Sequence, residues 1–339
     1  MNSSNELSKE KTGSKNIFRK LKSDYFLQKL FNILLKIKSL YIIKYNKNIK
    51  DRIKISIKDY KEYSEIYSPI EIEIKPANNQ YGKFININKK NELYFHIYFN
   101  NKEEIKRNYL NENENIEIIK IIINHQITSF EGLFEDCECI EYMCFKKFYR
   151  NNIINMSDMF NGCYSLEELN ISNFNTDNVT NMDGMFLDCS LLKELNLSNF
   201  NTNNVTNMGD MFLDCSLLKE LNLSNFNTNN VTIMNDLFNG CSSLEELDLS
   251  NFNTNNVTNM AGMFYGCSSL EELNLSNFNT NNVISMVGMF YRCSSLKELN
   301  LSNFNTNNVT NMVAMFYGCS VHFQNKIRAQ YKNIKEEAF

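Results

Sequence analysis

The chain has 339 residues, 43% of them hydrophobic, with 35 Lys and Arg against 39 Asp and Glu, 10 Cys, 2 Pro and no Trp. This composition excludes a wholly disordered or collagen-like chain, and the length suits about two domains. Lys29, Lys36 and Lys38 interrupt the most apolar stretch, so we expect no membrane span. The first 24 residues are polar and lack a signal-peptide core, which predicts a cytoplasmic location.

Charge is distributed unevenly along the chain. Residues 1–60 contain 15 basic and 5 acidic residues, whereas residues 163–320 contain 4 basic and 16 acidic ones. A basic head therefore precedes an acidic body. No aromatic or glycine pattern typical of nucleic-acid binding accompanies the basic residues, so we expect no nucleic-acid partner.

The first 130 residues predict three successive regions. We expect a disordered basic tail over 1–22, amphipathic helices over 23–55 and a β-rich head over 56–130. Alternating apolar residues predict strands in and beside that head, at 53–57, 70–74, 84–87, 93–99 and 116–123. Because an open first layer of a repeat protein exposes its core, we expect the head to cap the repeats that follow.

The helical stretch over 26–53 resembles an F-box. The similarity rests on Leu30-Phe31, Leu34, Ser39-Leu40 and Asn46, although the usual leading Leu-Pro is absent. An F-box joined to repeats would imply a ubiquitin-ligase substrate receptor. The alternative interpretation is a plain pair of capping helices.

A 26-residue repeat fills residues 131–320. Its clearest marker is a column of cysteines at this spacing: Cys163, Cys189, Cys215, Cys241, Cys267, Cys293 and Cys319. Each copy is a variant of C-S-S-L-E-E-L-N-L-S-N-F-N-T-N-N-V-T-N-M-x-x-M-F-x-x. One more step back leads to Cys137, so a degenerate first repeat brings the number of repeats to seven.

Each repeat predicts a short strand followed by a turn. In Leu166-x-x-Leu169-x-Ile171, the last two apolar residues alternate with an outward-facing Asn170, as in a strand with one buried face. The Asn-rich residues 172–181 predict a turn, with Phe174 and Val179 pointing inward.

The second half of each repeat predicts a short helical turn. Met182, Met185 and Phe186 share one helical face, with Thr180 or Asn181 as a candidate N-cap. The in-register cysteines are expected to be buried free thiols. Because one repeat cannot offset its own ordering entropy, the copies must stack into a solenoid of short parallel strands and short helical turns, closed by a C-terminal tail or cap over 321–339.

The motif F-x-x-C-S-S-L-x-x-L-x-L-S-x-F-x-T-x-x-V-x-x-M-x-x-M-F resembles the repeat of the BspA-like leucine-rich repeat family of surface proteins. The resemblance covers residues 133–320. It implies a leucine-rich-repeat solenoid used for binding, often at cell surfaces, without a catalytic residue. A cell-surface adhesin is therefore an alternative to a cytoplasmic scaffold.

Two outward-facing columns make up the candidate binding face. We expect a protein ligand to contact a concave strand face formed by Glu168, Asn170, Glu194, Asn196, Glu220, Asn222, Glu246, Asp248, Glu272, Asn274, Glu298 and Asn300. Such a face suits a basic or amide-presenting partner. The alternative is a soluble surface copied along with the core.

Candidate catalytic and metal chemistry is weak. Carboxylate pairs repeated in identical environments do not form an active site, because catalysis needs two environments that separate the pKa values. Cys137, Cys139 and Cys144, with His125 upstream, lack the paired hooks of a zinc site. We therefore expect no enzyme, no catalytic residue, no metal and no cofactor.

Overall fold

The computed structural model describes residues 23–24, 27, 52, 61, 65–112 and 114–339. The chain divides into two units, residues 1–68 and 69–339. In the first unit, Arg52 Nε lies 2.7 Å from Asp24 Oδ1 in an ion pair. The tail predicted over 1–22, the helices over 23–55, the strand over 53–57 and the F-box-like stretch lie almost wholly outside the described residues.

The second unit begins with a six-stranded sheet. The strand order β4-β3-β6-β1-β7-β8 joins β1 (Ile70–Pro76), β3 (Phe95–Phe99), β4 (Glu104–Ile105), β6 (Ile119–Ile123), β7 (Ile140–Lys147) and β8 (Glu168–Asn170). In β1, Ile70, Ile72 and Ile74 are buried, because alternate side chains of a strand face the same side. A two-stranded ribbon of β2 (Gly82–Lys83) and β5 (Tyr109–Leu110) and the 3-10 turn η1 (Glu92–Tyr94) complete this region.

Three of the strands predicted in the head are confirmed, and one is wrong. The predicted range 70–74 lies within β1, and the ranges 93–99 and 116–123 contain β3 and β6. Residues 84–87 form no strand, because their backbone groups pair with two different segments. Phe84 N–H donates to Asn108 O, whereas Asn86 N–H donates to Leu133 O. The sheet also continues past residue 130, since β7 pairs in parallel with β8 of the next repeat.

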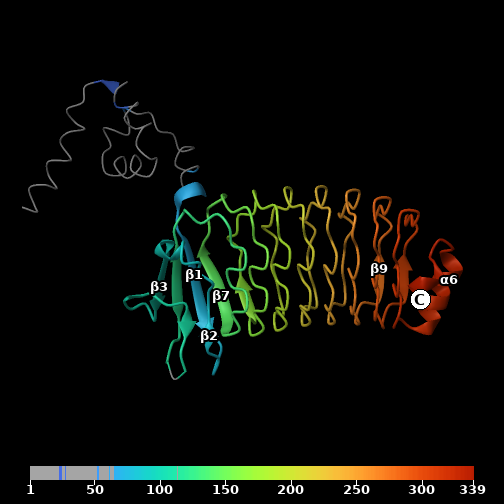
Figure 1. Cartoon of the computed structure of the whole chain (residues 1–339), viewed down its shortest axis with the longest axis horizontal. Coiled ribbons are helices and arrows are strands. Elements are labelled where there is room, and N and C mark those ends of the chain that lie inside the picture. The colour runs from blue at the N-terminus through green and yellow to red at the C-terminus, as the bar shows by residue number, and fades with distance from the viewer. Residues whose placement is uncertain (1–22, 25–26, 28–51, 53–60, 62–64, 113) are drawn as a thin grey trace, which may run out of the picture. The chain divides into compact units, whose positions relative to one another are not determined.

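The 26-residue repeats lie on one another as successive turns (Figure 1). Backbone hydrogen bonds join neighbouring turns, for example from Phe186 N–H to Met211 O at 3.0 Å. One phenylalanine column runs through the stack with ring centroids 5.4 to 5.8 Å apart, from Phe134 to Phe339. The predicted inward positions of Phe174 and Val179 are confirmed by their burial.

The continuous parallel ladder lies at a different position from the predicted one. Besides β8, the Glu-Leu-Asn segment forms strands only at β9 (Glu272–Asn274) and β10 (Glu298–Asn300), with an isolated bridge between Glu220 and Glu246. An unbroken series of bridges instead precedes the methionines, at Ser129, Asn155, Asn181, Asn207, Ile233, Asn259, Ser285 and Asn311. An Asx turn after each Glu-Leu-Asn segment limits that segment to three residues.

The helical turns predicted after each Asn-rich segment are wrong, because tight turns replace them. Gly184 and Asp188 have φ of 58° and 57°, so two left-handed residues flank Met185-Phe186 and prevent a helix. Asn181 Oδ1 does accept a hydrogen bond from Asp183 N–H at 3.1 Å, but in an Asx turn and not in a helix cap.

The C-terminal residues close the last turn. Helix α6 (Val321–Gln330) has Ser320 as its N-cap, whose side chain accepts from Phe323 N–H, and it buries Phe323 and Ile327. Beyond it, residues up to η2 (Glu336–Ala338) take the place of a further repeat. Ala314 N–H donates to Glu337 O, and Phe316 N–H donates to Ala338 O. The backbone of the final repeat is therefore paired and not left open.

Candidate binding groove

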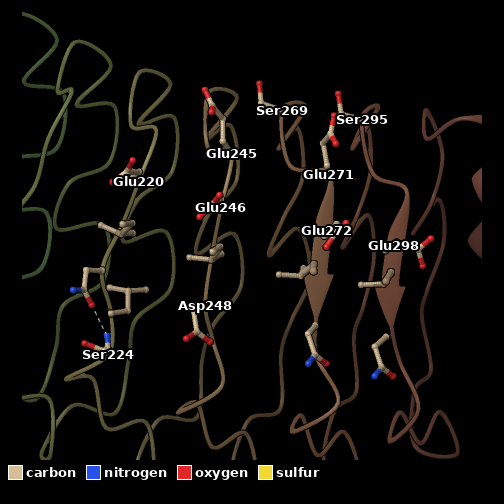
Figure 2. Close-up of a pocket in the computed structure, with 18 of the residues that line it drawn as sticks. Glu220, Ser224, Glu245, Glu246, Asp248, Ser269, Glu271, Glu272, Ser295 and Glu298 are labelled. Atoms are coloured by element: carbon tan, nitrogen blue, oxygen red, sulfur yellow. Dashed lines mark hydrogen bonds between the residues drawn. The ribbon is translucent and has the colours of Figure 1, made fainter.

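A groove of about 1460 Å³ crosses four successive turns on the strand side (Figure 2). Its walls come from Glu220, Glu246, Glu272 and Glu298 and from the residues that follow each of them. Gln330 and Tyr331, at the end of α6, line it as well. A hollow that combines several turns with a cap residue offers a partner more contact than a flat sheet face.

The glutamates share one column because each occupies the same place in its repeat. Glu272 pairs with Glu298 in the parallel register of β9 and β10, and Glu220 forms a bridge with Glu246. The leucine after each glutamate points to the other face: Leu273 and Leu299 are buried. Period-two alternation therefore exposes the carboxylates and anchors the segment.

All twelve residues of the predicted binding face are exposed. Eight of them line the groove: Glu220, Asn222, Glu246, Asp248, Glu272, Asn274, Glu298 and Asn300. The other four, Glu168, Asn170, Glu194 and Asn196, occupy the same columns in earlier turns, outside the groove lining. The later turns of both columns therefore line the groove, whereas the two earlier turns lie outside its lining.

The asparagine column has a fixed side-chain orientation. Asn222 Oδ1 accepts from Ser224 N–H at 3.0 Å, as drawn in Figure 2, and Asn274 and Asn300 make the equivalent bonds to Ser276 and Ser302. Because the carbonyl oxygen of each amide is engaged, its NH₂ group remains as the outward donor. At Asp248 this column presents a carboxylate instead.

Lysines neutralise the column beside the glutamates. Three pairs join adjacent turns along it, Lys193–Glu167, Lys219–Glu245 and Lys297–Glu271, with N···O distances of 3.2, 3.4 and 2.7 Å. At the C-terminal end, Lys326 pairs with Glu298 at 2.5 Å. Within the described part of the chain, Glu220, Glu246, Asp248 and Glu272 take part in no ion pair, so the centre of the groove has an uncompensated negative charge.

Sequence reasoning missed several residues that line the groove. Ser269 and Ser295 line it, whereas the equivalent positions in two earlier turns hold the exposed Leu191 and Leu217. Serine also occupies this position at Ser165 and Ser243, which do not line the groove, so the repeat pattern carried no signal for Ser269 and Ser295. Tyr331 had no signal either, because it enters the groove from outside the repeat.

Two of the cysteines that were considered as zinc ligands each donate a hydrogen bond to a different backbone carbonyl. Cys137 Sγ donates to Glu135 O at 3.7 Å, and Cys139 Sγ donates to Lys83 O at 3.2 Å. All ten cysteines are buried and free. Among the residues that the structure describes, no three His, Cys, Asp or Glu side chains are grouped to hold a metal ion.

None of the helices in the described part of the chain has the length and apolar character that a membrane span requires.

Comparison with known proteins gives one family match. The model of a family described as "Mycoplasma protein of unknown function, DUF285" matches residues 128–246 and 216–330, more than half of the chain. A crystal structure of a leucine-rich repeat protein from Bacteroides ovatus is similar, with 18% identity, a TM-score of 0.40 and coverage of 62% of this chain and 48% of the other. The match thus spans about half the length of that protein. No curated protein matches the chain.

Proposed function

Because the chain belongs to the DUF285 family, whose description states no activity, we propose a function from the groove itself. The protein is a non-enzymatic interaction module whose groove binds a basic segment of a partner protein. One observation carries this proposal: Glu220, Glu246, Asp248 and Glu272 line one groove, and none of the described lysines or arginines forms an ion pair with them. A cationic partner would provide the missing counter-charge and would be steered toward the groove.

The stacked turns support a leucine-rich-repeat solenoid of the BspA-like kind. Each turn contributes leucines, a cysteine and a phenylalanine to a core that continues into the next turn, as in Leu218, Cys215 and Phe212. Such stacking gives a rigid scaffold that presents one extended surface. Rigidity favours binding, because little conformational entropy is lost when the partner docks.

Charge reversal tests the proposal with a matched control. The variant Glu246→Lys/Glu272→Lys changes the centre of the groove, whereas Glu168→Lys/Glu194→Lys makes the same change of charge in the same column outside the groove. Each purified protein is immobilised and used to capture partners from an extract of the source cells. We expect the groove variant to lose the captured protein and the control variant to retain it.

Two results would contradict the proposal. Equal loss in both variants would mean that binding depends on net charge alone, and unchanged capture in both would mean that this face is not used. Circular dichroism of each variant establishes that the turns remain folded. Because the four glutamates are exposed, their substitution leaves the core unchanged.

A further inference from the structure

Arg150 places a positive charge in the interior of the protein, where the junction between the head and the repeats begins. Its side chain is 0% exposed. In the next turn, 26 residues on, the equivalent position holds Thr176, a buried neutral residue whose Oγ1 donates to Asn201 O at 3.0 Å. The first turn therefore buries a guanidinium group at the position where later turns bury a hydroxyl group.

One end of this guanidinium group is held by the head. Nη1 of Arg150 donates to Asn124 O at 3.0 Å and to Ile127 O at 3.1 Å, two carbonyl groups that follow β6. Beside it, Asn152 Nδ2 donates to His125 O at 3.3 Å. These contacts join the first turn to the residues that leave the head sheet, and they fix the orientation of the guanidinium plane.

The other edge of the guanidinium group has no partner among the protein atoms. Nε and Nη2 of Arg150 are both buried, and neither forms a hydrogen bond. These two nitrogens share one edge of the planar group and direct two N–H bonds in parallel, the arrangement that binds two oxygens of one carboxylate. Asn152 Oδ1 is a further buried atom without a partner, so this segment lacks more than one polar contact.

Water alone does not balance this site, because it accepts hydrogen bonds without supplying a negative charge. A buried ion is tolerated when an opposite charge compensates it. Burial lowers the pKa of Arg150 to about 10, and no carboxylate opposes that shift, so the group is still charged at about pH 7. The charge also acts on His125, whose pKa is lowered by burial and by Arg150.

We propose that the Nε–Nη2 edge of Arg150 binds a small planar oxyanion, of the size of formate, nitrate or hydrogen carbonate, as its counter-ion. Two oxygens of such an ion accept the two parallel N–H bonds. Because the side chain is shielded from solvent, the site excludes larger anions, and the ion enters when the junction opens locally. Arg150 lies outside the groove lining, so this site does not depend on the proposed function.

The bound anion stabilises the junction between the head and the first repeat. It fixes one edge of the guanidinium group whose other end holds Asn124 and Ile127. Binding to the folded state alone raises the unfolding temperature and makes it depend on the anion concentration. It should also slow hydrogen exchange at the amides that join the first two turns there, such as Phe130 N–H, which donates to Asn155 O at 2.9 Å.

The test replaces a large anion by a small one at constant ionic strength. The full chain is dialysed into sodium gluconate, and sodium formate is substituted for it in steps while calorimetry follows thermal unfolding. We expect a saturable rise of the unfolding temperature, by about 5 °C at about 100 mM formate. Ligand-observed NMR with ¹³C-formate should show binding to the folded protein at about one site per chain.

Three variants assign the effect to the fork. Arg150→Thr restores the residue of the later turns and should abolish the response to formate. Arg150→Lys keeps a positive charge without the two parallel N–H bonds and should weaken formate binding at least about tenfold. Lys147→Gln is the matched control, because it removes an exposed cation at the end of β7, paired with Glu71, and should leave the response unchanged.

Three results would overturn the anion site. Equal unfolding temperatures of the wild type in formate and gluconate would mean that the fork is satisfied without an anion. An equal response in Arg150→Thr and the wild type would place the effect elsewhere on the protein. Formate binding to Arg150→Lys as tight as to the wild type would exclude the fork, and this comparison remains available if Arg150→Thr does not fold.

Discussion

Thr228 and Asn253 exchange two hydrogen bonds between adjacent turns. Thr228 Oγ1 donates to Asn253 O at 2.9 Å and accepts from Asn253 N–H at 2.7 Å. Thr228 is buried, as are its equivalents Thr176, Thr202, Thr254, Thr280 and Thr306. This threonine column joins the turns at positions where no strand ladder is available.

We expect Thr228→Val to destabilise the protein by about 2 kcal/mol, because a valine of the same shape leaves the buried N–H and C=O of Asn253 without their partner. Thr228→Ser keeps the hydroxyl and should lose less. Urea unfolding followed by circular dichroism measures both changes. Equal stability of the valine variant and the wild type would show that water replaces the hydroxyl.

The cysteine column should be chemically inert in the folded protein. Burial raises the pKa of Cys139 to about 11 and that of Cys319 to about 12. Cys215 Sγ also donates to Phe186 O at 3.1 Å, a bond that recurs at each later repeat cysteine. Because the thiolate is the reactive form, a thiol reagent at about pH 8 should label no cysteine until urea is added. Rapid labelling of the native protein would contradict this prediction.

Ionisation of Asp210 should lower stability. Burial, with Asp236 and Asp183 nearby, raises the pKa of Asp210 from 3.8 to about 6. Between about pH 4 and pH 6 the carboxyl group keeps its proton in the folded state but has lost it in the unfolded state, so the free energy of unfolding falls as the pH rises. Above about pH 6 the full loss of stability is present. At about pH 7.5 we expect Asp210→Asn to gain about 1 kcal/mol, less than the full shift implies because the side chain is half-exposed.

The gain from Asp210→Asn should disappear at about pH 3.5, where the aspartate is mostly protonated in both states. Asn235 Nδ2 lies 3.4 Å from Asp210 Oδ1, and an asparagine can accept the same hydrogen bond. Asparagine also tolerates the left-handed backbone at this position, where φ is 54°. Thermal unfolding at both pH values measures the difference, and an equal effect at both would exclude ionisation as the cause.

The C-terminal cap should depend on one hydroxyl group. Leu301 N–H donates to Tyr331 Oη at 3.0 Å, and Tyr331 Oη donates to Leu299 O at 3.3 Å, beside the outer edge of β10. We expect Tyr331→Phe to lose about 1 kcal/mol and to speed hydrogen exchange at Leu301, because the edge amide loses its acceptor. The exposed Tyr317 provides the matched control, since Tyr317→Phe should change neither quantity.

The sequence by itself determined the repeat and its buried columns. Once copies of 26 residues stack, equivalent residues must lie above one another, so the burial of Cys215 and Phe212 and the exposure of Glu220 follow from spacing alone. The alternation in 70–74 likewise predicted a strand with one buried face. These features are local or periodic, so residue spacing along the chain is enough to identify them.

Only the tertiary structure decided which turns form the groove, which carboxylates keep an uncompensated charge, and where the ladder between turns lies. A lysine can form an ion pair with a glutamate in the preceding or the following repeat, and an asparagine side chain can form a hydrogen bond within its own turn or to the next turn. Near-identical repeat sequences therefore do not specify which partner is used. Tyr331 comes from a segment with no period at all. Such contacts depend on how separate segments pack against one another, and residue spacing along the chain does not encode that.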